Sequence, residues 1–264
     1  MIIEPGKQER KLKSYLDEGK YKNVFLVFWH GLGDAVQFML VLDCLKELYP
    51  GIHFHLGLLR GLDLETVYPE AVLITDLKNI EEGFDLTVLL NFPVEIPGLT
   101  KSELCCREEL GIPLVSGYKP LPKFPGKLVA VHFNLTCLPT LANPTEETAE
   151  KIWNEIREAG FIPIEVHFSH VFDNPDNKKF GFVDCTVRKC VARVASLIGL
   201  IQHCTAFVGV VSGPFHCAMA TMPHDRIAFL EKAIPVARFT HEKIQTFDIN
   251  NYRGGVKEWL STLT

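Results

Sequence analysis

The segment Asn23–Trp29 is a continuous run of apolar, β-branched and aromatic residues, and it constrains the fold more than any other stretch of the sequence. Such a run is typical of a strand that is buried on both faces of a parallel sheet. It ends in His30-Gly31-Leu32-Gly33-Asp34, and apolar residues then recur with helical spacing from Asp34 to Tyr49, before Pro50-Gly51. The pattern predicts a strand, a glycine turn and a helix.

The same alternation continues through both halves of the chain. In the first half we expect a short helix or turn at 62–68, and further strands at 52–58, 72–75 and 84–91. In the second half we expect strands at 127–133, 161–168 and 206–211, and helices at 144–159, 191–203, 213–221 and 254–263. Strands that alternate with helices predict an α/β fold with parallel sheets and right-handed crossovers.

A proline-rich stretch separates the two halves. It holds Pro113, Pro120, Pro122 and Pro125, and amphipathic periodicity disappears there, as is typical of a linker. We therefore predict a first domain over residues 1–115, a linker over 116–126 and a second domain over 127–264. Two such halves place a cleft between the carboxyl ends of two sheets, where open α/β folds bind ligands.

Charge and cysteine usage exclude several classes of protein. The chain has 264 residues with 27 Lys+Arg and 32 Asp+Glu, so we expect no nucleic-acid-binding surface spread over the molecule. No apolar run reaches the ~20 residues that span a bilayer, and the N-terminus lacks a secretory signal, so we expect a cytoplasmic protein. The eight cysteines include no CxxC pair and are interpreted as reduced thiols. His167 and His170 are interpreted as a strand end rather than as metal ligands, and no metal site is expected.

A second glycine turn, Val211-Ser212-Gly213-Pro214-Phe215-His216-Cys217-Ala218, follows a predicted strand and opens a helix of small residues. Ser212 suits the capping position and Pro214 an early helical position. The N–H groups of Gly213, Phe215 and His216, with the Ser212 hydroxyl, could bind an anion such as a diphosphate. The His216 ring either donates to that anion or packs against the helix as an ordinary histidine, and the two interpretations stay open.

Asp34, in the first turn, also has two interpretations. Asp is a preferred N-cap, worth ~1 kcal/mol, and this is the simpler explanation. The functional alternative is a general base that takes a proton from a hydroxyl nucleophile. A dinucleotide fingerprint would need a small residue where Val36 stands, which disfavours a dehydrogenase.

Together the two turns resemble the signature regions of the ADP-heptose:lipopolysaccharide heptosyltransferases, glycosyltransferase family 9. The resemblance implies the GT-B fold, in which two Rossmann-like parallel-sheet domains face a cleft. The acceptor would bind the first domain and the nucleotide-sugar the second. Asp34 would be the catalytic base, with Gly31 and Gly33 on the acceptor side. The residues around the donor phosphates would be Ser212, Gly213, Pro214 and His216.

The resemblance also implies a reaction. A heptose-like sugar would move, with inversion and without a metal or cofactor, from a nucleotide-diphosphate donor to a hydroxyl of a saccharide or glycolipid acceptor. The chain departs from the family where Val211 replaces a common Asp and where Ala142 replaces a basic residue, and it is shorter than typical members. Loss of a charge-assisted phosphate contact costs ~1.5 to 3 kcal/mol of donor affinity unless Arg188 or Lys189 replaces it.

Three alternatives are kept. A non-catalytic nucleotide- or sugar-binding protein is consistent with Val211 and Ala142. A sugar-nucleotide epimerase of the same fold would need acid/base groups beside the donor sugar, for which His132, His167 and His170 are the candidates. A weak peripheral contact with an anionic membrane or phosphorylated acceptor is a minor alternative for a cationic patch near the N-terminus, namely Lys7, Arg10, Lys11, Lys13, Lys20 and Lys22.

Overall fold

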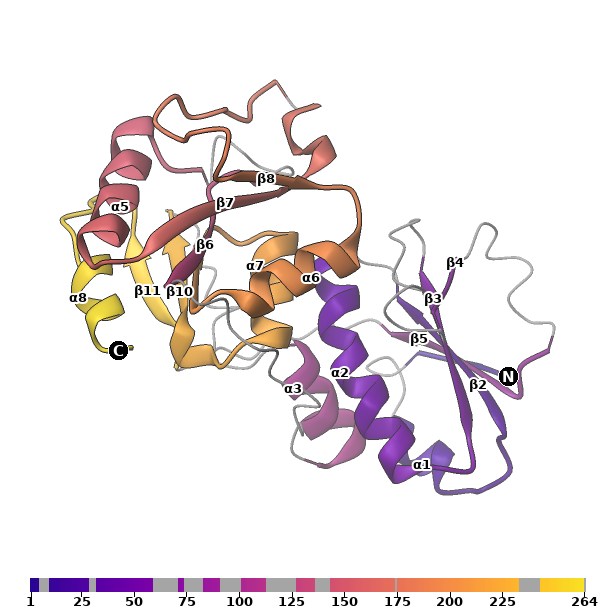
Figure 1. Cartoon of the computed structure of the whole chain (residues 1–264). Coiled ribbons are helices and arrows are strands. Elements are labelled where there is room, and N and C mark those ends of the chain that lie inside the picture. Colours follow the sequence, from indigo (N-terminus) through magenta and orange to yellow (C-terminus); the bar gives the residue numbers. More distant parts are fainter. Residues whose placement is uncertain are drawn as a thin grey trace. The chain divides into compact units, whose positions relative to one another are not determined.

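The computed structural model describes residues 1–4, 10–28, 32–58, 71–73, 83–90, 101–112, 127–135, 143–173, 175–232 and 243–263. The chain divides into two compact units, Met1–Gly117 and Tyr118–Thr264, and each has its own parallel sheet (Figure 1). The linker predicted over 116–126 and the helix or turn predicted at 62–68 lie outside the described residues.

The first unit holds a five-stranded sheet in the order β1-β5-β2-β3-β4, in which all neighbouring strands are parallel. Its strands are β1 (Ile2–Ile3), β2 (Asn23–Phe28), β3 (His53–Leu58), β4 (Ala71–Leu73) and β5 (Leu86–Leu90). The side chains of Val24, Phe25, Leu26 and Val27 are buried in the central strand β2. The unbroken apolar run therefore predicted this strand correctly.

The helices of the first unit are α1 (Leu12–Leu16), α2 (Leu32–Leu48) and α3 (Lys101–Cys105), which continues into a π-helical turn at Cys106–Leu110. No helix was predicted over 101–110. α2 confirms the predicted helix, but it begins at Leu32, so Asp34 is its third residue and does not stand at the capping position. None of the helices in the described ranges is long and apolar enough to cross a bilayer.

The second unit holds a six-stranded parallel sheet in the order β11-β10-β9-β6-β7-β8. Its strands are β6 (Leu128–His132), β7 (Ile162–Phe168), β8 (Arg188–Val191), β9 (Ala206–Gly209), β10 (Ile227–Glu231) and β11 (Gln245–Asp248). β6, β7 and β9 confirm the predicted strands, whereas β8, β10 and β11 were not predicted. The chain runs from β6 outward to β8 and then resumes at β9, so the strand order reverses between β6 and β9.

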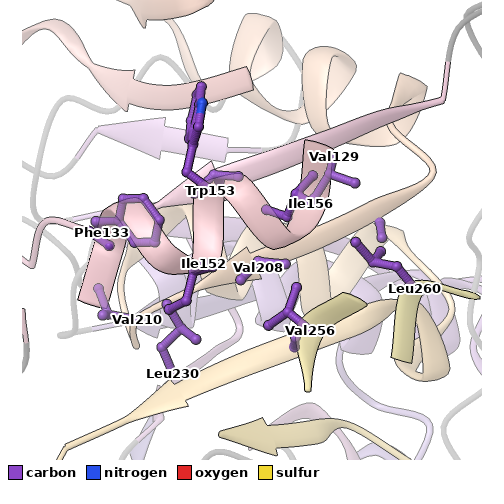
Figure 2. Close-up of a cluster of buried hydrophobic side chains, with 14 of the residues drawn as sticks. Val129, Phe133, Ile152, Trp153, Ile156, Val208, Val210, Leu230, Val256 and Leu260 are labelled. Carbon is purple, nitrogen blue, oxygen red and sulfur yellow. The ribbon is translucent and has the colours of Figure 1, made fainter. Parts of the chain in front are cut away.

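Helices cover both faces of the second sheet. They are α5 (Glu146–Glu158), α6 (Val194–His203), α7 (Gly213–Thr221) and α8 (Val256–Ser261). α5 and α8 belong to a core with the strand residues Val129 and Leu230 (Figure 2). On the other face, the Phe215 ring of α7 lies 6.2 Å from that of Phe207 and 5.3 Å from that of Phe229. Because side chains alternate along a strand, both faces of the sheet are buried.

Gly209, the last residue of β9, lets β9 and β6 lie close together where the strand order reverses. A Cβ at Gly209 would lie 2.7 Å from Phe207 Cε1 and 2.8 Å from the carbonyl oxygen of His132 on β6. The N–H of Val210 donates to that same carbonyl at 3.0 Å. A side chain at position 209 would therefore push β9 away from β6.

We expect Gly209→Ala to lower the free energy of unfolding by about 1 to 3 kcal/mol, because the added methyl group has no space. Gly199→Ala on α6 is the matched control. Nothing outside its own helix lies within 4 Å of the Gly199 Cβ position, so that change should stabilise the protein by roughly 0.5 to 1 kcal/mol. Chemical denaturation of the two variants measures both effects, and equal stabilities would contradict the steric role of Gly209.

Candidate functional site

The candidate site is the carboxyl edge of the second sheet between β6 and β9. β7 and β8 lie on one side of this point, and β9, β10 and β11 lie on the other. In open α/β sheets, the loops that follow the two strands at a reversal of strand order go to opposite faces of the sheet. Ligands bind in the crevice between these two loops. The segments that leave the sheet here are Phe133–Leu135 after β6 and Val210–Ser212 after β9.

The second glycine turn forms the N-terminus of α7, whose bounds match the prediction. Ser212 is the N-cap, with an extended backbone (φ −167°, ψ 174°). Its Oγ accepts a hydrogen bond from the Phe215 N–H at 3.3 Å and donates to the Val210 carbonyl at 3.0 Å. Pro214 is the second residue of the helix, where a missing N–H has no cost.

Two of the three backbone N–H groups that the sequence predicts as anion donors are already hydrogen-bonded to Ser212. The Phe215 N–H donates to Ser212 Oγ, and the His216 N–H donates to the Ser212 carbonyl at 3.0 Å. Of the three predicted backbone donors, Gly213 is the one whose N–H meets no acceptor among the described residues. The prediction of three backbone donors is therefore corrected to one, together with the positive end of the helix dipole.

α7 differs from α5 in the charge of its first turn. α5 begins at the N-cap Thr145, and Glu146 and Glu147 in its first turn offset the helix dipole. The first turn of α7 contains no acidic residue. Of the two helices that follow β6 and β9, where the strand order reverses, α7 is therefore the one whose first turn can attract an external anion.

His216 lies in the first turns of α7 and is only 7% exposed. Its ring centroid lies 5.7 Å from that of Phe215, in an edge-on arrangement. This packing agrees with the interpretation of His216 as an ordinary histidine against the helix. A contact between His216 and a donor stays a prediction.

A buried polar cluster lies on β7 and β8. Glu165 Oε1 and His167 Nε2 are 3.1 Å apart, although the contact is not aligned as a hydrogen bond. Arg188 donates from Nε to Glu165 Oε2 at 2.6 Å and from Nη2 to the Phe180 carbonyl at 2.7 Å. Burial raises the pKa of Glu165, but the contacts with His167 and Arg188 outweigh it and hold that pKa below its usual value.

His132, the last residue of β6, is a buried neutral histidine. Its Nδ1 lies 2.7 Å from the Val166 carbonyl, to which the neutral ring donates, and its ring centroid is 5.1 Å from that of His167. Burial, with a smaller effect of His167, lowers the pKa of His132 to about 3. The two histidines named as acid/base candidates thus lie together, but both are buried away from solvent. The side chain of His170 lies outside the described residues.

The two cations suggested as replacements for the missing basic residue are engaged elsewhere. Arg188 is held by Glu165, and Lys189, which lies on the edge strand β8, donates to the Thr186 carbonyl just before that strand. Ala142 lies outside the described residues. Among the residues that the structure describes, no three His, Cys, Asp or Glu side chains gather as metal ligands would.

Lys232, which no sequence pattern singled out, lies at the same carboxyl edge. It follows β10, and its Nζ donates to the Asn143 carbonyl at 3.1 Å. Asn143 Oδ1 in turn accepts from the Leu135 N–H at 2.6 Å. The apolar run Ile227–Leu230 was a usable signal, because it predicts a buried strand with Lys232 just after its carboxyl end.

In the first unit, Asp34 follows the strand beside which the strand order reverses, as Ser212 does in the second unit. The order β1-β5-β2-β3-β4 reverses between β2 and β5, and Asp34 lies in the first turn of the helix that follows β2. Acidic residues are common in the first turn of a helix because they suit the helix dipole, so the sequence position of Asp34 has a structural explanation beside the catalytic one. Gly33 is the second residue of α2, and Gly31 lies outside the described residues.

Ion pairs offset much of the cationic patch near the N-terminus. Arg10 and Lys20 both pair with Glu18, and Lys13 pairs with Asp17 at 2.8 Å. Lys7 lies outside the described residues. The contact with a membrane stays a minor prediction.

No protein-family model and no curated protein matches the sequence, whereas solved structures match it closely in fold. ADP-heptose lipopolysaccharide heptosyltransferase II of E. coli has a TM-score of 0.67 and 11% identity over 91% of this chain and 98% of its own. The E. coli heptosyltransferase WaaC with ADP has a TM-score of 0.61 and 12% identity over 92% of this chain and 100% of its own.

The iron-containing dodecameric glycosyltransferase TibC of enterotoxigenic E. coli has a TM-score of 0.56 and 15% identity over 92% of this chain. This chain spans 65% of the length of TibC. At these identities the likeness shows the fold: the chain has the α/β, GT-B-like fold of heptosyltransferases, with two Rossmann-like parallel sheets. The family that the two glycine turns resemble is the family of these structural neighbours.

The buried His132 predicts a loss of stability on acidification. An unfolded histidine, with a pKa of about 6.5, binds a proton below that pH, whereas folded His132 binds one only near its lowered pKa of about 3. Because the unfolded state then holds more protons, stability falls as pH falls from about 6.5 to about 3, by roughly 2 kcal/mol at pH 5.

His132→Asn keeps an amide donor for Val166 and cannot titrate, so we expect it to flatten this dependence. The control His53→Asn changes an exposed histidine on β3 and should leave the dependence intact. Urea denaturation from pH 7 to pH 5 compares the variants. An unchanged slope in His132→Asn would rule out His132 as its source.

Proposed function

We propose that this protein is a glycosyltransferase that moves a heptose-like sugar from a nucleotide-diphosphate donor to an acceptor hydroxyl. The observation that carries the proposal is the start of α7, which lies where the strand order reverses and has no carboxylate in its first turn. Proteins of the same fold include TibC in complex with ADP-D-β-D-heptose and WaaC with ADP, which supports a nucleotide-sugar donor.

In the proposed site, the donor diphosphate binds at the N-terminus of α7. The Gly213 N–H and the helix dipole attract the phosphate oxygens, and the Ser212 cap and Pro214 hold the backbone in place. His216 is the proposed side-chain contact. When the sugar leaves, negative charge grows on the diphosphate, so the same partial positive charge stabilises the transition state more than the bound donor.

In the same proposal, Asp34 is the general base on the acceptor side. It takes the proton of the acceptor hydroxyl as that oxygen attacks the anomeric carbon from the face opposite the diphosphate, and the configuration inverts. Gly31 and Gly33 leave room for the acceptor beside the turn. In this proposal the reaction uses neither a metal nor a cofactor, and the start of α7 stabilises part of the charge of the leaving group.

A binding protein without catalysis is the second candidate. Val211, an apolar and partly exposed residue, directly precedes the Ser212 cap, where it offers no polar group to a sugar or phosphate. An epimerase is not proposed, because His132 and His167 are buried.

A carboxylate placed in the first turn of α7 should repel the diphosphate. We expect Gly213→Asp to bind ADP about 10-fold more weakly than Gly213→Asn, because the two variants differ in one charge and have the same side-chain shape. Calorimetric titration of ADP at low salt measures the difference. Equal affinities of the two variants would place the diphosphate elsewhere.

Removal of the Asp34 carboxylate should abolish transfer and leave donor binding intact. We expect Asp34→Asn to lower the rate of sugar transfer by about 10² to 10⁴ and to bind ADP as the wild type does. The matched control is Glu47→Gln, which changes an exposed carboxylate on the same helix. Undiminished turnover in Asp34→Asn would exclude Asp34 as the base. If the wild type binds the donor but transfers to none of a broad panel of acceptors, the second candidate is favoured.

A further inference from the structure

Cys190 is an exposed thiol beside a buried histidine. Among the described cysteines, Cys185 and Cys190 are exposed and the others are buried. Cys190 lies on the edge strand β8, and its register partner on the neighbouring strand β7 is His167 (Figure 1). Since neighbouring strands lie about 4.8 Å apart, the two residues are direct neighbours across the sheet.

The side chains of Cys190 and His167 lie on the same face of the sheet. Two residues earlier on the same strands, Arg188 and Glu165 are also register partners, and Arg188 Nε donates to Glu165 Oε2 at 2.6 Å. Side chains alternate between the two faces along a strand. Cys190 and His167 therefore point to the face that carries this ion pair, and they are adjacent there.

The His167 ring is fully buried, yet one of its nitrogens is left over. Its Nε2 is 3.1 Å from Glu165 Oε1, and its ring centroid is 5.1 Å from that of His132 and 4.7 Å from that of Phe172. Among the described residues, its Nδ1 has no hydrogen-bond partner. Because the strand order is β6-β7-β8, His132 borders the ring from one side and Cys190 from the other.

This arrangement can remove the proton of a thiol. Burial raises the pKa of Glu165, but His167 and Arg188 hold it below its usual value, so the carboxylate is ionised near pH 7. With an Nε2–H toward that carboxylate, the His167 Nδ1 carries the lone pair that accepts a proton. The ionised carboxylate stabilises the imidazolium that then forms, and the thiolate is the reactive form of cysteine. Rotation about the Cα–Cβ bond of Cys190 moves its Sγ between solvent and the ring.

Cys185 is a matched comparison, because it is equally an exposed cysteine but has different neighbours. It lies in the turn before β8, and its thiol donates to the carboxylate of Asp184. A nearby carboxylate disfavours a negatively charged thiolate. Cys190 instead follows Lys189 and has the buried histidine beside it.

We propose that Cys190 is a modification site, at which the thiol forms a mixed disulfide with a small disulfide such as oxidised glutathione. His167 takes the proton of Cys190, and the thiolate attacks one sulfur of the small disulfide. The S–S bond of the reagent breaks as the new S–S bond forms, and the departing thiolate takes the proton from His167. The reagent is thus the oxidant, and one small thiol is released for each Cys190 modified. The proposal does not depend on the proposed donor site.

The experiment measures how fast each exposed cysteine reacts with oxidised glutathione, and separately with the neutral reagent iodoacetamide, in the full chain at pH 7. Trypsin cleaves after Arg188, so Cys185 and Cys190 fall in different peptides, which mass spectrometry quantifies. The same measurement in urea removes the fold and keeps the local sequence. His167→Gln removes the base, and thermal unfolding shows whether that variant is folded.

We expect Cys190 to react about 10-fold faster than Cys185 with both reagents in the folded protein, and the two rates to become similar in urea. His167→Gln should slow Cys190 about 10-fold and leave Cys185 unchanged. Equal rates in the folded wild type overturn the proposal. So does a rate ratio that persists in urea, because the local sequence then causes it. Undiminished reaction of Cys190 in folded His167→Gln also overturns it, and if that variant does not fold, the comparison of folded and urea-unfolded wild type decides.

Discussion

The second unit depends on the close approach of β6 and β9 at their carboxyl ends. Gly209 has no Cβ to separate the strands, and the Val210 N–H donates to the same His132 carbonyl that a Cβ would strike. The loops that follow β6 and β9 therefore leave the sheet from fixed and adjacent points. The position of the Ser212 cap, whose hydroxyl donates to the Val210 carbonyl, follows from this spacing.

Much of this fold could be predicted from the sequence where burial leaves a clear pattern. β2 and β9 are covered on both faces, which gives unbroken apolar runs, and α7 carries its capping serine and early proline in the sequence. The edge strands β8 and β11 are short and keep exposed polar residues, so their patterns look like loops. β10 is an apolar run that could have been recognised.

The candidate site was less predictable, because its contacts join distant parts of the chain. Ser212 could be identified as a cap, since its partners lie within three residues. The Ser212 cap, however, occupies the Phe215 N–H, which the sequence alone leaves available for an anion. Lys232 and Asn143 are 89 positions apart, and nothing local marks either as a partner of the other. Glu165 is a partial exception: an acidic residue inside the apolar segment Ile162–Phe168 signals a buried partner, which Arg188 supplies.

The Ser212 cap also determines when the proposed donor site becomes ordered. Its hydroxyl is fixed by the Val210 carbonyl and the Phe215 N–H, both groups of the protein's own backbone. The start of α7 is thus in place before any ligand arrives, and the entropic cost of ordering it belongs to folding rather than to association. If the proposed function holds, such a site releases a spent nucleotide and accepts the next donor with its phosphate-binding backbone already in place.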